Sequence, residues 1–303
     1  MLNYQNPSLI LLLISLLWAC SPIYEDEDFF QPIQTDTYQL DEYAGDTGIE
    51  LDSKYALDPD NIHEIQYQSF DGKSEQNISA IFIGDVNRID QTTVIAYAHD
   101  RQANIDYYWP RAKLLANLDL ALYGVMILDY RGYGKSSGKP SEAGLIADVD
   151  HALRWLKDNG LSNDRLIMYG YGLGSAPVIE LAANPRSLSP AKIILEAPLA
   201  SMEYLIQDAT SLAVPGNYFS DLLFDNVKTI KNVQQPLMWI HGTNDKEYSL
   251  KQGELVFNNH PGTVGVDKLA YRITGASHHD LPTRFNSGFD GYLFNIQNFI
   301  ESL

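Results

Sequence analysis

Two side chains toward the end of the chain have the types and the spacing of a catalytic acid and its base. Asp245 comes just after the apolar run that ends at His241, and His278 comes just after the next apolar run, 268–274. A carboxylate that orients an imidazole gives a general base, which removes the proton from a hydroxyl nucleophile in acyl transfer. When the nucleophile lies on a turn between a strand and a helix, the order along the chain is nucleophile, acid, base. The nucleophile is therefore expected before Asp245.

The segment that should carry this nucleophile has a glycine in the decisive position. Residues 166–175 have the pattern of a strand, a sharp turn and a helix, and the turn reads G-x-G-x-G where G-x-S-x-G is expected. Gly172 thus stands where a serine would supply the attacking oxygen. Ser175 is the nearest alternative, but Leu173 and Pro177 occupy the places where the pattern requires glycine. The sequence predicts loss of the nucleophile, which in a serine protease costs on the order of 10⁶ in kcat.

Each of these residues also has a purely structural interpretation. Asp245 could be a loop carboxylate that caps the following helix, and His278 could be a structural histidine. A metal site built from His278, His279 and Asp280 has no further cluster of ligands to support it. We therefore expect no metal and no cofactor.

The elements that must position these residues follow a regular alternation. Apolar runs alternate with helical stretches, which predicts an α/β protein with a mostly parallel central sheet and helices on both faces. Two alternating runs, 62–70 and 77–83, flank Asp71-Gly72 and predict an antiparallel hairpin at one edge. The expected buried strands are 93–98, 124–130, 166–170, 192–197, 236–241 and 268–274.

One stretch, about 201–230, interrupts the alternation. It contains Pro215-Gly216-Asn217 and is too long for a simple connection between two strands. We expect a small lid insertion here, over the carboxyl ends of the strands, where sites form in open α/β sheets.

Several short motifs, taken in order, resemble those of α/β-hydrolase-domain proteins over about 62–303. The resemblance implies an α/β-hydrolase fold, and the family consists mostly of serine esterases, thioesterases, lipases and peptidases. It also implies that Asp245 is the triad acid, that His278 is the triad base and that Gly172 occupies the nucleophile position. The motifs are DYRGYGKSSGKPSE at 129–142, YGYGLGS at 169–175, EAP at 196–198, FDN at 224–226, HGTND at 241–245 and GASH at 275–278.

The same resemblance implies that the backbone N–H groups of Arg101 and Leu173 are the oxyanion donors. The family has His-Gly-x after its third strand, whereas this chain has His99-Asp100-Arg101. A carboxylate at Asp100 opposes a developing negative charge unless a cation neutralises it. Aspartate also does not permit the close backbone approach that glycine permits.

The N-terminal part predicts export and a lipid anchor. Residues 10–19 are apolar but too short to cross a bilayer, and they end at Cys20, the single cysteine. We interpret 1–19 as a signal peptide that resembles a bacterial lipoprotein signal, with Cys20 lipidated; an ordinary secretory signal is the alternative. Residues 20–60 are expected to form an acidic tether, and 61–303 the α/β-hydrolase domain. The aromatic residues Tyr24, Phe29, Phe30 and Tyr43 argue against full disorder of the tether and indicate that part of it packs on the domain.

The charge balance narrows the function further. Lys and Arg number 21 against 39 Asp and Glu, a net charge of −18, which excludes nucleic acid as a partner. We expect a lipoprotein of the bacterial cell envelope, at the outer membrane or cell surface, or alternatively a secreted or periplasmic protein. It should be catalytically impaired and bind a small acyl-type ligand or a protein partner at the lid or pocket. The alternative is an active esterase, thioesterase or peptidase that uses a non-standard nucleophile or water activated by the His278–Asp245 pair.

Overall fold

The computed structural model describes residues 29–119, 121–210 and 222–302. The predicted signal peptide, 1–19, and the predicted lipidation site, Cys20, lie outside these residues. Part of the predicted lid also lies outside them. Within the described ranges, no helix is both long enough and apolar enough to span a membrane.

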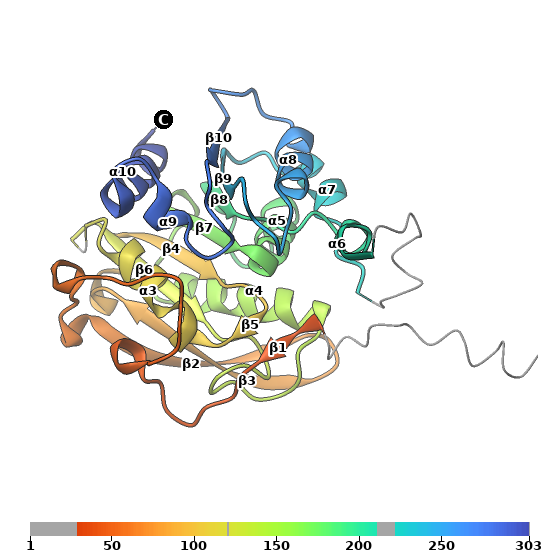
Figure 1. The fold of residues 1–303 in the computed structure, drawn as a ribbon. Coiled ribbons are helices and arrows are strands. Elements are labelled where there is room, and N and C mark those ends of the chain that lie inside the picture. Colours follow the sequence, from red (N-terminus) through yellow and green to blue (C-terminus); the bar gives the residue numbers. More distant parts are fainter. Residues whose placement is uncertain (1–28, 120, 211–221, 303) are drawn as a thin grey trace, which may run out of the picture.

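An eight-stranded sheet forms the centre of the molecule, in the order β10-β9-β8-β7-β4-β6-β3-β2 (Figure 1). From β6 to β10 all neighbouring strands pair in parallel. Every residue of β6, β7, β8 and β9 is buried, as expected for parallel strands covered on both faces. The predicted fold class is confirmed. The parallel strands are β4 (Thr93–Ala98), β6 (Tyr123–Leu128), β7 (Leu166–Tyr171), β8 (Lys192–Glu196), β9 (Leu237–Gly242) and β10 (Lys268–Ile273).

The predicted hairpin closes one edge of this sheet. Strand β2 (Ile62–Phe70) pairs antiparallel with β3 (Glu75–Ile83), which begins two residues earlier than expected and pairs antiparallel with β6. In the connecting turn, Asp71 Oδ1 accepts hydrogen bonds from the backbone N–H groups of Lys73 and Ser74, both at 2.8 Å.

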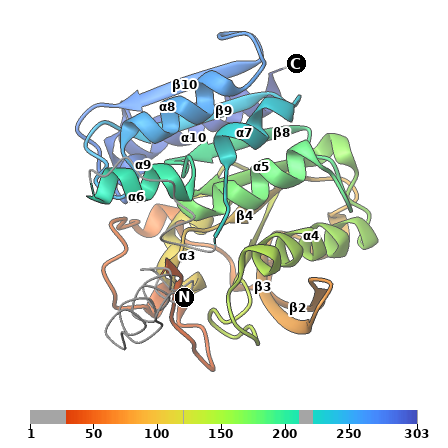
Figure 2. The same cartoon turned by 90° about the vertical axis from the view of Figure 1, so that its right-hand side faces the viewer.

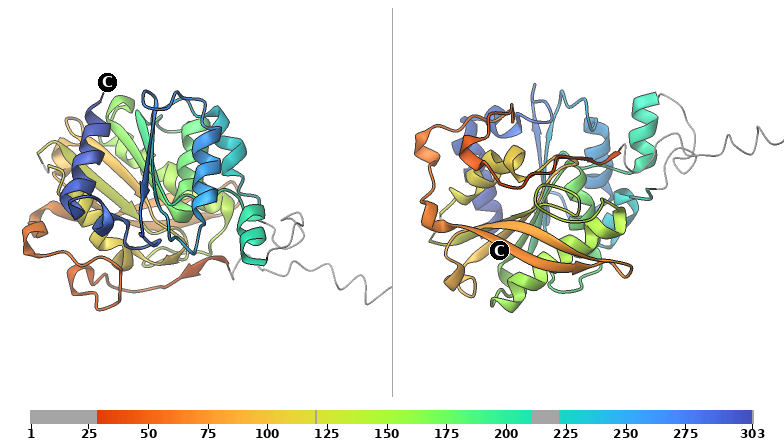
Figure 3. Two further views of the ribbon diagram at one scale, coloured as in Figure 1. Left: turned by 45° about the horizontal axis from the view of Figure 1, so that its top comes forward. Right: turned by 90° about the horizontal axis from the view of Figure 1, so that it is seen from below.

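Helices cover both faces of the sheet (Figures 2 and 3). Each face has its own cluster of buried apolar side chains. Ser141 is the N-cap of one of these helices, because its Oγ accepts the N–H of Gly144 at 3.1 Å. One face carries α4 (Glu142–Asp158), α5 (Ser175–Ala183) and α8 (Leu250–Asn259), and the other α3 (Ile105–Ala116) and α10 (Gly288–Glu301). Short helices are α6 (Met202–Thr210), α7 (Asn226–Thr229) and α9 (Leu281–Arg284), with 3₁₀ turns at Leu40–Glu42, Ser53–Tyr55, Pro59–Asn61, Val86–Arg88, Asn163–Arg165, Gly172–Gly174 and Ile230–Asn232.

The tether expected over 20–60 is not a free spacer in its described part. Strand β1 (Gln31–Pro32) pairs in parallel with β5 (Gln102–Ala103), in the loop that follows β4. Phe30 is 2% exposed and Tyr55 is 4% exposed. Aromatic side chains within the polar sequence therefore bind this segment to the domain, and burial of their apolar area stabilises the contact.

The stretch expected to form a lid is only partly described. Helix α6 follows β8 and lies beside α8, where Asp208 accepts hydrogen bonds from Ser249 Oγ at 2.6 Å and Gln252 Nε2 at 2.9 Å. Residues 211–221 of the predicted lid lie outside the described part of the chain.

Candidate active site

The turn after β7 has the sharp geometry that the glycine pattern predicts. Gly172 has φ +54°, in the left-handed region that favours glycine, and it begins the 3₁₀ turn that leads into α5. The whole turn is buried. The structure therefore places Gly172 where the strand–turn–helix pattern expects the nucleophile.

The predicted acid and base lie together at the carboxyl ends of β9 and β10. His278 Nδ1 is 2.8 Å from Asp245 Oδ2, and both residues are buried. Asp245 is held in turn by its own loop, because its Oδ1 accepts the N–H groups of Glu247 and Tyr248, each at 2.9 Å. The imidazole is thus oriented with its Nε2 toward the turn after β7.

Asp100 occupies the space between this histidine and the turn. Its Oδ2 is 3.1 Å from His278 Nε2, and its Oδ1 accepts hydrogen bonds from the Leu173 N–H at 2.6 Å and the Tyr248 hydroxyl at 3.0 Å. The residue is 1% exposed. The predicted oxyanion donor Leu173 therefore already has an anion bound, and that anion is a side chain of the protein.

The same carboxylate fills the volume of a nucleophile side chain. A Cβ added at Gly172 would lie 2.8 Å from Asp100 Oδ2 and closer still to Oδ1 and Cγ. Such contacts are too short for non-bonded atoms, so either side chain excludes the other. The effect of Asp100 thus differs from the expected repulsion of an oxyanion, because its charge is paired with His278.

The charged groups of Asp100, Asp245 and His278 stabilise one another. Burial disfavours the charged imidazole, but the hydrogen bonds and charges of Asp100 and Asp245 outweigh burial and raise the pKa of His278 to about 10. Burial also disfavours the Asp100 carboxylate, yet its contacts with His278 and the Leu173 N–H lower its pKa to about 2. The pKa of Asp245 is lowered as well, against burial, by its bonds to His241 and His278. At neutral pH His278 therefore already carries the proton that a general base would have to accept.

These shifts predict a pH profile for stability. The folded protein holds the His278 proton from about pH 6.5, its ordinary pKa, to about pH 10, whereas the unfolded chain has lost it. Stability is then fully present below about pH 6.5 and falls as pH rises toward 10, by at most about 1.4 kcal/mol per pH unit. The stability that Asp100 contributes is fully present above pH 3.8, its ordinary pKa, and falls as pH drops toward about 2. Urea unfolding between pH 4 and 10, with a chelator present, should show this decline; a flat profile above pH 6.5 would contradict the pairing.

Arg101, the other predicted oxyanion donor, joins the site to the N-terminal segment. Its carbonyl accepts the Gln31 N–H at 3.0 Å and the Tyr133 hydroxyl at 2.7 Å, and its Nη1 donates to the Phe29 carbonyl at 3.2 Å. The guanidinium also lies over the Phe29 ring, 5.5 Å from its centroid. The loop that carries Asp100 is thus braced from outside by residues 29–31.

Ser175, the alternative nucleophile, does not face this cluster. It is fully buried at the start of α5, and its Oγ donates to the carbonyl of Gly172 at 2.7 Å. Asn226 Nδ2 lies 3.4 Å from the same oxygen. These contacts indicate a structural hydroxyl that stabilises the turn.

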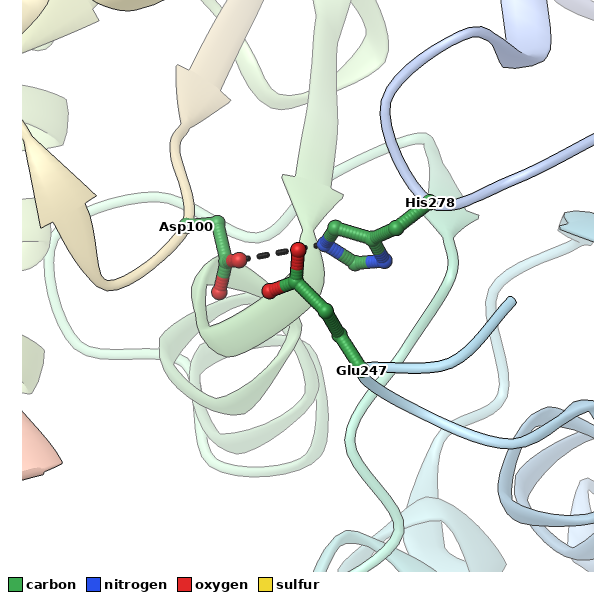
Figure 4. Close-up of side chains that lie close together, drawn as sticks. All are labelled: Asp100, Glu247 and His278. Carbon is green, nitrogen blue, oxygen red and sulfur yellow. Dashed lines mark hydrogen bonds and ion pairs between the residues drawn. The ribbon is translucent and has the colours of Figure 1, made fainter.

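Sequence reasoning missed Glu247 and Tyr248. Glu247 lies on the same loop as Asp245 and points toward Asp100 and His278 (Figure 4). Its Oε1 is 2.6 Å from His279 Nε2, and its Oε2 accepts a hydrogen bond from Gln102 Nε2 at 3.2 Å. A second carboxylate two residues after a candidate triad acid was the available signal.

The fold and the placement of Gly172, Asp245 and His278 define a class of protein: the chain has an α/β-hydrolase fold, and part of its sequence is similar to alpha/beta hydrolase domain-containing proteins. Among curated proteins it is similar to alpha/beta hydrolase domain-containing protein 17C of Mus musculus, 32% identical over 177 residues that cover 57% of this chain and 49% of that protein. It is also similar to alpha/beta hydrolase domain-containing protein aho-3 of Caenorhabditis elegans, 30% identical over 181 residues, 58% of this chain and 48% of that protein. The chain spans about half the length of the curated relatives it matches.

Solved structures support the fold over a longer part of the chain. An esterase from Pyrococcus furiosus matches with a TM-score of 0.64 at 14% identity, over 90% of this chain and 97% of that one. The esterase RhEst1 from Rhodococcus sp. matches with a TM-score of 0.58 at 18% identity, over 80% of this chain and 99% of that one. No protein-family model matches the chain. At these identities the structural matches show the fold alone.

Proposed function

We propose that this chain is a catalytically impaired member of the α/β-hydrolase superfamily that works by binding rather than by hydrolysis. One observation carries the proposal: the Asp100 carboxylate lies against Gly172, where the nucleophile is expected, and is hydrogen-bonded to both Leu173 and His278. The Asp100 side chain thus fills the space of the nucleophile, accepts the N–H of the oxyanion donor and pairs with the base. A small acyl-type ligand or a protein partner is the expected binding target.

The cellular setting is part of the same proposal. Lipid attached to Cys20 would hold the protein at the bacterial cell envelope, with the binding domain outside the bilayer. Mass spectrometry of the mature N-terminus should find an acylated Cys20. An unmodified cysteine would favour the secreted or periplasmic alternative.

The alternative function, an active hydrolase with an unconventional nucleophile or an activated water, requires a free basic nitrogen. His278 Nε2 is instead hydrogen-bonded to Asp100, and Asp245 is bonded to Nδ1. This is why we prefer a binding role.

Labelling with a fluorophosphonate probe tests the proposal directly. The native protein should show no labelling above that of a heat-denatured sample, since no activated hydroxyl faces His278 among the residues that the structure describes. Turnover of p-nitrophenyl acetate should equal the rate without protein. Stoichiometric labelling, or ester turnover that disappears in His278→Ala, would establish the alternative function.

A further inference from the structure

We propose that Asp100, Glu247 and His278 form a binding site for a divalent transition-metal ion of the Zn²⁺ or Mn²⁺ type. The three residues come from the loops after β4, β9 and β10 (Figure 4). The sequence predicts no metal here, because the near neighbours of His278 along the chain offer no complete ligand set. Only the fold adds the two carboxylates. This inference goes beyond the proposed function and is independent of it.

The spacing of the donor atoms suits a metal ion. One oxygen each from Asp100 and Glu247 and one nitrogen of His278 lie within 4.8 Å of one another. Zn²⁺ at its usual bond lengths of about 2.1 Å holds tetrahedral ligand atoms about 3.4 Å apart. Asp100 Oδ2 and His278 Nε2 are already 3.1 Å apart. The Glu247 carboxylate, which is bonded to His279 and Gln102, has to turn toward the other two donors.

Two of the three ligands, His278 and Asp100, are oriented by a second partner. His278 Nδ1 is bonded to Asp245, the arrangement in which a metal-binding imidazole normally directs its other nitrogen at the ion. Asp100 Oδ1 is fixed by Leu173 and Tyr248, which leaves Oδ2 facing the imidazole. Such outer partners determine ligand orientation, and here they are in place without the ion.

The electrostatics and the donor types favour a particular class of ion. Three carboxylates, those of Asp100, Asp245 and Glu247, surround His278, so a dication lowers the mutual repulsion. One imidazole with carboxylates suits Zn²⁺, Mn²⁺ or Fe²⁺, whereas Ca²⁺ and Mg²⁺ prefer oxygen ligands alone. On binding, the proton on His278 Nε2 passes to solvent and the nitrogen lone pair coordinates the ion.

The ion can reach this site from one side. Asp100 and His278 are 1% and 2% exposed, but the side chain of Glu247 is 24% exposed. Glu247 therefore lies between solvent and the two buried ligands. Glu247 does not belong to the pair formed by Asp245 and His278. It is therefore the best residue to substitute in a test of metal binding.

The test is metal binding to the full chain after chelation and dialysis. Equilibrium dialysis with elemental analysis should give one Zn²⁺ or Mn²⁺ per chain, with a rise in Tm that 10-fold more Mg²⁺ does not reproduce. Glu247→Gln should weaken binding at least about 10-fold. Glu254→Gln is the matched control, because Glu254 is a partly exposed carboxylate paired with Arg272 at 2.9 Å, and it should bind like wild type.

A second measurement does not depend on any variant. Co²⁺ bound to the wild-type protein should absorb strongly in the visible range, as expected for a low-coordinate site with a nitrogen ligand, and one equivalent of Zn²⁺ should abolish the absorption. Failure to bind any ion stoichiometrically would overturn the inference. Binding that is equal in wild type, Glu247→Gln and Asp100→Asn would also overturn it, by placing the ion elsewhere on the acidic surface. The result of fluorophosphonate labelling does not depend on whether a metal ion binds. The metal-site proposal can therefore be wrong while the proposed loss of hydrolysis is correct, and the reverse.

Discussion

Gly172→Ser alone is expected to remain inert toward a fluorophosphonate probe, whereas Gly172→Ser combined with Asp100→Gly is expected to react. In the single variant the new side chain meets the Asp100 carboxylate, which also retains the Leu173 N–H and the His278 imidazole. Removing the carboxylate frees the oxyanion donor, the base and the space in one step. The double variant should exceed both single variants at least about 10³-fold in labelling rate and ester turnover, since parts of one catalytic unit are strongly non-additive.

The controls for this pair are simple. Adding His278→Ala to the double variant should remove the gained turnover, which distinguishes a rebuilt triad from a reactive surface serine. Circular dichroism should show that each variant is folded. If Gly172→Ser alone reacts as fast as the double variant, then Asp100 does not block the site.

The second large effect is expected on stability. His278→Gln removes the cation that lies between two buried carboxylates, those of Asp100 and Asp245, and breaks the ion pair that each of them forms with it. Breaking a buried ion pair in this way costs about 3–5 kcal/mol. Urea unfolding at pH 7 with a chelator present should show this loss.

A matched substitution and a double variant make the result specific. His151 lies partly buried on α4, bonded to the Ala147 carbonyl at 2.8 Å, and His151→Gln should cost less than about 1 kcal/mol. Asp100→Asn added to His278→Gln should recover part of the loss, because one unpaired charge disappears. Equal stability of His278→Gln and wild type would show that the cluster is not an ion pair.

The strands and the meeting of Asp245 with His278 follow from sequence because both rest on simple rules. Buried parallel strands are recognisable as apolar runs, and their carboxyl ends share one edge of the sheet. Two polar residues just after neighbouring strands, β9 and β10, must therefore lie close together. The hydrogen bond between them needed only side chains of sufficient reach.

The position of Asp100 could not be predicted in the same way. The sequence identifies Asp100 as a departure from the expected glycine, but the direction of a loop side chain depends on contacts made after folding. Here those contacts come from Leu173, Tyr248 and His278, on three other segments. From the sequence alone, an aspartate that repels an oxyanion cannot be distinguished from one that forms an internal ion pair. The fold distinguishes them, because it brings His278 to Asp100.

The acidic and polar composition of 29–60 hides how extensively this segment packs on the domain. Acidic and polar residues predict a solvated spacer, yet Phe29, Phe30, Tyr38 and Tyr55 are all less than 9% exposed. Tyr38 donates to Asp129 at 2.6 Å, which adds a buried hydrogen bond to the apolar contacts. The aromatic residues of the acidic segment indicate from sequence that part of it packs on the domain, but they do not indicate which elements it contacts.

The parallel pairing of β1 with β5 has a mechanical consequence. A pull on the chain from its amino-terminal side acts on the bond from Arg101 Nη1 to the Phe29 carbonyl and on two backbone hydrogen bonds, Gln31 N–H to the Arg101 carbonyl and Ile33 N–H to the Ala103 carbonyl, at 3.0 and 2.9 Å. Both acceptors follow Asp100 within three residues, so a load on this segment acts on the loop that carries the carboxylate. We therefore expect tension applied at the amino-terminal end of the domain to act on the loop that links β4 to the buried Asp100–His278 cluster.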